Sequence, residues 1–113
     1  MHELSICGAI AGIVTERAGD RRVRTVYLQV GQLRQVVPDT LVYCWSLVTA
    51  DTALDGSRIA VERIAARITC RTCAATREMG DVPSFLCTAC AGTDIDVVAG
   101  EEFLITSLEL AEA

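Results

Sequence analysis

The sequence is short of several features that would assign it to a common class of protein. It contains one histidine, and aromatic residues make up only 4% of its 113 residues. Its longest apolar runs are interrupted by Asp, Arg or Gly well short of a membrane span, and no basic region precedes an apolar run at its start, as it would in a signal peptide. We therefore expect one compact cytoplasmic protein with no membrane segment.

Groups of residues that typically support catalysis are also missing. The sequence offers no second histidine to serve as a base, no glycine-rich phosphate loop, and no serine in a nucleophile motif. It has no low-complexity stretch, and no internal repeat apart from its paired cysteines. We expect a protein that binds or carries something and is not an enzyme.

The charge of the chain argues against a nucleic-acid partner. The formal net charge is −5, and four cysteine thiolates around one divalent ion would make it more negative. The one basic cluster, Arg17 with Arg21, Arg22 and Arg24, is short and interrupted, so we interpret it as a solvated turn and strand start. We expect neither nucleic acid nor a membrane as a partner.

Apolar periodicity predicts two helices. In residues 4–18, Ile6, Ile10 and Ile13 recur at helical spacing, and a glycine follows where a helix end favours it. A second helix is predicted from Pro38 as far as the "DG" at 55–56, because proline and the acid after it suit a first helical turn. Its buried side is predicted to contain Leu41, Trp45 and Val48.

Runs of β-branched residues predict the strands. Residues 23–30, "VRTVYLQV", alternate between two faces. Residues 57–69 are predicted to form one long strand with a bulge near Glu62 and Arg63, because the apolar positions change from odd to even there. Residues 94–110 predict a short strand, a glycine turn and a longer strand.

These elements predict an α+β fold of two helices packed on a three-stranded sheet, with a small four-cysteine, zinc-ribbon-like insertion before the last strand. The main domain is predicted to comprise residues 1–69 and 94–113, and the inserted domain residues 70–93. The oligomeric state stays open, although the edge of such a sheet is a place where chains could exchange strands.

Four of the six cysteines form two closely spaced pairs. "CRTC" and "CTAC" place Cys70, Cys73, Cys87 and Cys90 in a C-x2-C-x13-C-x2-C pattern. Two residues between ligands allow a tight turn to present both sulfurs to one ion while its amides point at them, and Gly92 follows where a positive φ is useful. The intervening segment is too poor in apolar residues to fold by burial alone, so metal would supply its folding free energy.

Zinc is the metal that this pattern favours. Unligated cysteines and redox-active pairs are the alternatives, but doubled spacing of this kind is typical of metal sites. A rubredoxin-like iron site would be expected to have aromatic packing that this segment lacks. Because four thiolates leave no open coordination position, we expect a structural role for the zinc.

Cys7 and Cys44 lie apart from these pairs. Each falls on or beside an apolar helical stripe, and free cysteine is among the residue types most often buried. We expect both to pack in the core.

The single histidine, His2, directly follows Met1, and this start has a specific chelating chemistry. The α-amine of Met1, the backbone nitrogen of His2 and its imidazole can form adjacent chelate rings, which the amide or carboxylate of Glu3 can complete. Nitrogen donors in a tetragonal plane suit Ni(II) or Cu(II). Because amine and imidazole must lose protons to bind, loading should weaken as pH falls through the histidine range. A terminal histidine is nevertheless more often simply solvated.

Taken together, these motifs resemble the HypA/HybF family of nickel metallochaperones. The resemblance rests on "MHELS" before an amphipathic helix, a strand ending in "VG", "PDTLVYCWSLVT", the doubled CxxC and a final "LITSLEL", and it covers essentially the whole chain. It implies Ni(II) as transient cargo at Met1, His2 and Glu3, and structural Zn(II) at the four paired cysteines. It also implies delivery of nickel to the [NiFe] hydrogenase large subunit precursor with a HypB-type GTPase as partner. Asp39 is a further candidate nickel ligand, on a looser match.

Two other functions compete with a nickel carrier. A zinc-ribbon module that binds nucleic acid or a transcription partner would also use a doubled CxxC, but it would be expected to carry basic and aromatic residues around the cysteines. Here Arg71 and Arg77 stand beside Glu78 and Asp81. A thiol redox protein would be expected to have one exposed CxxC that opens a helix. The sequence leaves open the nickel affinity and geometry, whether the two metal sites are coupled, and which hydrogenase, or urease pathway as well, is served.

Overall fold

The computed structural model describes residues 3–80 and 84–111, which form two compact units. The first comprises the described parts of residues 1–29, 36–62 and 104–113. The second comprises residues 30–35 and the described parts of 63–103. The cysteine segment 70–93 lies within this second unit, which is larger than that segment on both sides. The predicted division into a main domain and a 70–93 insertion stays a prediction.

Helix α1 spans Glu3–Ala18, close to its predicted range. Its buried residues follow the helical spacing of three to four and are Cys7, Ile10, Val14 and Ala18. Ile13, which we predicted on the buried stripe, is 50% exposed, so the stripe is narrower than its sequence suggests.

Helix α2 spans Pro38–Thr49, with proline at its start as predicted, and buries Leu41 and Trp45. The predicted continuation to the "DG" at 55–56 is wrong. After Thr49 the chain turns, and Asp51 adopts a left-handed φ of 61°. The Thr52 hydroxyl donates to the Thr49 carbonyl oxygen at 2.6 Å, which satisfies a helix-end carbonyl without further helical turns.

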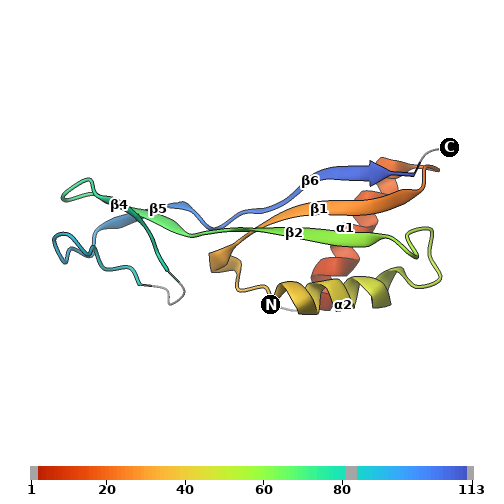
Figure 1. Ribbon diagram of the computed structural model, residues 1–113, viewed down its shortest axis with the longest axis horizontal. Helices are drawn as coiled ribbons and strands as arrows, with labels where there is room; N and C mark the ends of the chain where they lie inside the picture. Colours follow the sequence, from red (N-terminus) through yellow and green to blue (C-terminus); the bar gives the residue numbers. More distant parts are fainter. Residues whose placement is uncertain (1–2, 81–83, 112–113) are drawn as a thin grey trace. The chain divides into compact units, whose positions relative to one another are not determined.

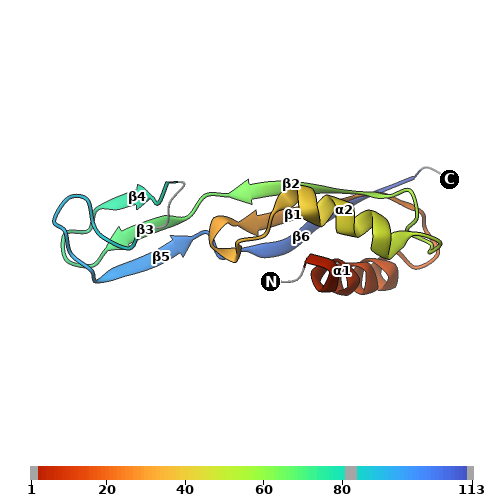
Figure 2. The ribbon, with the colours of Figure 1, turned by 90° about the horizontal axis from the view of Figure 1, so that it is seen from below.

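The first sheet has the strand order β2-β1-β6, with bounds Arg58–Ile64, Val23–Gly31 and Phe103–Leu110. Strands β1 and β2 run in the same direction, joined through α2, and β6 runs opposite to them (Figures 1 and 2). Both helices cover one face of this sheet (Figure 2). The predicted α+β class, with two helices on a three-stranded sheet, is therefore confirmed.

A second three-stranded sheet, which the sequence did not predict, has the order β4-β3-β5. Its strands span Thr76–Glu78, Arg67–Cys70 and Ile95–Ala99, and β3 pairs antiparallel with both neighbours. The predicted single strand over 57–69 is wrong, because the chain leaves β2 at Ile64 and begins β3 at Arg67. The irregularity in pairing lies between Arg67 and Ile68.

The second unit has a small core of its own. Ala66, Ile68 and Met79 are buried, and Leu33, Ile95 and Val97 pack against them. Leu33 comes from a short 3-10 helix, Gln32–Arg34, that lies between β1 and α2 in the sequence. Its amide donates to the Gly100 carbonyl oxygen at 2.8 Å, which ties this segment to the second unit.

No helix in the described residues is both long and apolar enough to cross a membrane.

Candidate metal centre

The two cysteine pairs sit in turns that are built alike. The Ala74 amide donates to the Cys70 carbonyl oxygen, and the Ala91 amide donates to the Cys87 carbonyl oxygen, each at 2.8 Å. The amides of Cys70 and Cys87 in turn donate to the carbonyls five residues later, at 2.9 Å in both cases. The same closed turn therefore holds each CxxC pair, one at the end of β3 and one before β5.

The residue after each pair adopts a left-handed conformation. Ala74 has φ 63° and Ala91 has φ 58°, whereas Gly92, which we predicted for a positive φ, does not have one. Space is instead tight at Gly92, because a Cβ there would lie 3.1 Å from the Cys90 sulfur, a contact that this side chain would have to relieve by moving slightly. The sequence therefore marked the right turn but assigned the wrong role to its glycine.

Ala91→Gly is expected to stabilise the zinc-loaded second unit by up to about 1 kcal/mol. The left-handed conformation costs alanine about 1–2 kcal/mol, and substitution by glycine removes this cost. The greater backbone freedom of glycine in the unfolded chain offsets part of the resulting stabilisation. The change in the free energy of unfolding is measured by urea denaturation, with hydrogen exchange of amides in the second unit as the probe. Ala89→Gly, in the same turn but without a positive φ, should destabilise the unit, and equal effects of the two substitutions would contradict the strain argument.

The four sulfurs come together in one cluster. Their Sγ atoms all lie within 4.8 Å of one another, and the Sγ–Sγ distance is 3.6 Å both for Cys70 with Cys90 and for Cys73 with Cys87. Sulfurs placed tetrahedrally at zinc–sulfur bonds of about 2.3 Å are about 3.8 Å apart. Cys70 and Cys87 are buried and the other two are exposed. The cluster fits a closed tetrahedral zinc site, while ligation by each cysteine stays a prediction.

Backbone amides prepare the first cysteine of each pair to ionise. Amides of Cys73 and Thr72 point at the Cys70 sulfur and lower the pKa of that thiol to about 6. Amides of Cys90 and Ala89 do the same for Cys87 and lower its pKa.

The second cysteine of each pair, Cys73 or Cys90, has a raised thiol pKa. The Gly92 amide lowers the pKa of Cys90, but the hydrogen bonds that this thiol shares with the other three cysteines outweigh it and raise the pKa to about 12. Four thiolates this close together repel one another, and a divalent metal would offset that repulsion in place of the shared protons.

Arg71, a charged side chain near the cluster, is paired within the unit. Arg71, which lies inside the first turn, forms ion pairs with Asp94 at 3.7 Å and with Asp96. The Arg71 guanidinium holds the pKa of Asp96 below its usual value. Arg71 is therefore already neutralised by carboxylates from the segment that enters β5.

The predicted nickel ligands lie at the other end of the sequence. Met1 and His2 are outside the described residues, and Glu3 is the first residue of α1, with a partly buried side chain. Asp39 lies in the first turn of α2. Assignment of nickel to these residues stays a prediction.

Cys7 and Cys44 are buried, as predicted, and take no part in the four-sulfur cluster. The Cys7 thiol lies 3.4 Å from the Leu41 carbonyl oxygen and donates to it, which links α1 to α2. Burial, together with nearby Cys44 and Glu3, raises the pKa of Cys7 to about 11. Cys7 therefore stays a protonated core thiol at neutral pH.

The fold and the four-thiol cluster define a small α+β protein with a candidate structural metal centre. The family model for hydrogenase/urease nickel incorporation, metallochaperone, HypA, matches residues 1–110. The chain belongs to the HypA family.

Relatives and solved structures agree with this assignment. The chain is 42% identical over 110 residues to the hydrogenase maturation factor HypA of Geotalea uraniireducens, covering 97% of this chain and 99% of the relative. It is 38% identical over 112 residues to the hydrogenase maturation factor HypA of Streptomyces avermitilis, covering 96% of this chain and 86% of the relative. The solution structure of the Ni metallochaperone HypA from Helicobacter pylori matches with a TM-score of 0.66 at 16% identity, over 97% of each chain, which supports the fold.

Proposed function

We propose that this protein carries Ni(II) and delivers it during maturation of [NiFe] hydrogenase, without turnover of its own. Its membership of the HypA family carries the proposal. The cargo ion would be held by the Met1 amine, the His2 imidazole and backbone nitrogen, and Glu3. Glu3 opens α1, so a ligand from this residue is fixed to a helix whose first turn favours a carboxylate.

The four-cysteine cluster would hold one structural zinc ion. Cys70, Cys73, Cys87 and Cys90 would be its ligands, and the ion would supply folding free energy to the second unit. The donor types support separate sites, because thiolates suit zinc whereas amine, amide and imidazole nitrogens suit nickel. Zinc would therefore stay in place while nickel is loaded and passed on.

The partners of such a carrier would be a HypB-type GTPase and the large subunit precursor of the hydrogenase. The alternative, a zinc-ribbon module for nucleic acid, has less support. Of its two arginines near the cysteines, Arg71 is paired with Asp94 and Asp96. Arg77 donates to backbone carbonyls.

Metal analysis of the purified protein tests the proposal. We expect about one retained zinc ion and about one added nickel ion per chain, the stoichiometry of one closed and one open site. Nickel loading should weaken below about pH 6.5, because protons compete for the His2 imidazole and the amine. Nickel that binds only by displacing zinc would contradict the proposal, and a salt-sensitive affinity for DNA or RNA would favour the zinc-ribbon alternative.

A further inference from the structure

Strand β4, the shortest strand of the second unit, carries a partly buried arginine, Arg77. Arg77 is the middle residue of β4 and lies directly opposite buried Ile68 in the β3–β4 pair. Directly opposed residues point to the same face of a sheet, so Arg77 faces the side on which Ile68 is buried. Its neighbours Thr76 and Glu78 are exposed, and Arg77 is partly buried.

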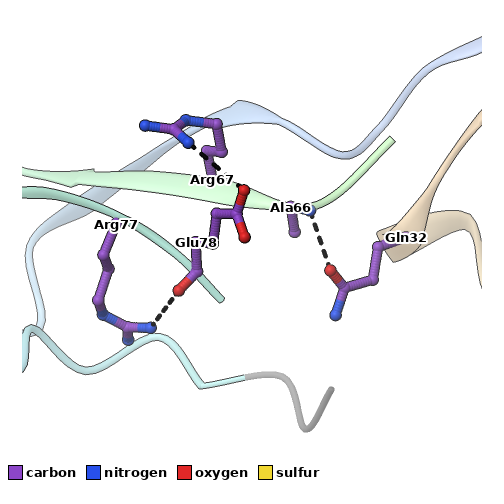
Figure 3. Close-up of polar contacts among 5 residues, drawn as sticks. All are labelled: Gln32, Ala66, Arg67, Arg77 and Glu78. Atoms are coloured by element: carbon purple, nitrogen blue, oxygen red, sulfur yellow. Dashed lines mark hydrogen bonds and ion pairs between the residues drawn. The ribbon is translucent and has the colours of Figure 1, made fainter. Parts of the chain in front are cut away.

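The guanidinium of Arg77 donates hydrogen bonds to backbone carbonyls. Nη1 donates to the Glu78 carbonyl oxygen at 3.2 Å, and Nη2 donates to those of Ser84, at 3.0 Å, and Leu86. Figure 3 shows the side chain reaching from β4 toward the following loop. Among the described residues Arg77 forms no ion pair, unlike Arg67 and Arg71.

These bonds connect the two halves of the cysteine cluster. β4 is paired with β3, which ends at Cys70, whereas Leu86 directly precedes Cys87. Charged donors to carbonyls are among the stronger hydrogen bonds, and one planar guanidinium can span several acceptors at fixed spacing. Arg77 therefore fixes the chain that enters the second pair relative to the strand beside the first.

The start of the intervening segment is held separately. The Gln32 side chain accepts from the Ala66 amide at 2.9 Å (Figure 3). The same side chain donates to the Gly80 carbonyl oxygen, and the Met79 amide donates to the Ala66 carbonyl oxygen at 2.8 Å. Gln32 therefore holds Gly80, and Arg77 holds Ser84 and Leu86, the last residue before Cys87.

We infer that Arg77 is a positioning residue for zinc: it holds the second cysteine pair against the first, and so sets how tightly the ion is bound and how slowly it leaves. The inference rests on the proposed zinc site. Without Arg77 the four cysteines remain, but zinc binding would then have to order the chain that enters the second cysteine pair. The entropy lost in that ordering would weaken zinc binding.

Arg77→Gln tests this role. Loss of a residue that hydrogen-bonds to a metal ligand typically costs about 10- to 100-fold in affinity. Arg77 acts one residue away, on the Leu86 carbonyl before Cys87, so zinc transfer to a chromogenic chelator should be faster, and the zinc dissociation constant higher, by about the lower end of that range. The Co(II)-substituted variant should keep the absorption of a tetrahedral tetrathiolate site, since the ligands themselves are unchanged. A distorted Co(II) spectrum would instead indicate damage to the ligand set and contradict a positioning role.

Two further variants make the result specific. Arg67→Gln removes an exposed ion pair with Glu78 of 3.6 Å, in which the side chains are 48% and 64% exposed, and should leave zinc release unchanged. Arg77→Lys keeps the charge but cannot span the three carbonyls, so its zinc release rate should lie between those of wild type and Arg77→Gln. This variant also replaces Arg77→Gln in the test if the glutamine variant does not fold. Zinc release in Arg77→Lys equal to that of wild type would overturn the inference. A wild-type protein that binds no zinc would instead refute the proposed site.

Discussion

Cys73→Ser is expected to release zinc and unfold the second unit while the first unit stays folded. The second unit's own apolar core is small, consisting of Ala66, Ile68 and Met79 with three partly buried neighbours. Structural zinc contributes on the order of 10 kcal/mol or more of folding free energy in small domains, far more than such a core can supply. The first unit has its own buried core, which contains Cys7, Ile10, Val14, Val26, Leu28, Leu41 and Trp45.

Metal analysis and residue-resolved hydrogen exchange measure this outcome. Zinc content should fall to near zero, and amides of β3, β4 and β5 should lose protection while those of α1 and β1 keep it. Cys44→Ser is the matched control, because Cys44 is buried in α2 and lies outside the cluster, and it should retain full zinc. Retained zinc in Cys73→Ser, or loss of both units together, would contradict this account.

Gly31→Ala is expected to destabilise the protein by at least about 3 kcal/mol, at the upper end of single substitutions. A Cβ at this position would lie 2.0 Å from the Gly100 carbonyl oxygen and 2.6 Å from the Glu101 amide nitrogen. Both are backbone atoms, so no side chain can move aside. Relief would require breaking neighbouring bonds such as that from the Gly31 amide to the Glu102 carbonyl oxygen, at 2.7 Å.

Gly12→Ala provides the matched control for that prediction. Gly12 lies within α1, and a Cβ there meets nothing within 4 Å. The substitution should stabilise the helix by roughly 0.5–1 kcal/mol, because alanine loses less backbone entropy than glycine. Urea unfolding of both variants gives the comparison, and a Gly31→Ala protein as stable as wild type would show that the strands do not approach as closely as described.

The elements with strong local patterns could be predicted from the sequence. Both helices and strand β1 follow from apolar spacing, and the cysteine cluster follows from the doubled CxxC, because two such turns supply one tetrahedral set. The break after Ile64 could not be predicted, since Ala65 and Ala66, which form it, include no glycine, proline or asparagine that would signal a turn. β4 is only three residues long, too short to show a period.

Long-range contacts account for the remaining differences. Leu33 contributes to the second unit although it lies between β1 and α2, and Arg77 faces inward to reach carbonyls up to nine residues away. Neither contact leaves a local pattern. Ala74 and Ala91 adopt left-handed turns that a sequence would signal with glycine or asparagine, so only the geometry identifies them.

Nickel titration of the zinc-loaded wild type against His2→Ala tests the carrier proposal most directly. The wild type should bind about one nickel ion, and His2→Ala should bind none while its zinc content and hydrogen-exchange protection stay unchanged, because His2 contributes only to the open site. Undiminished nickel binding in His2→Ala would contradict the proposal that the amino terminus holds the cargo.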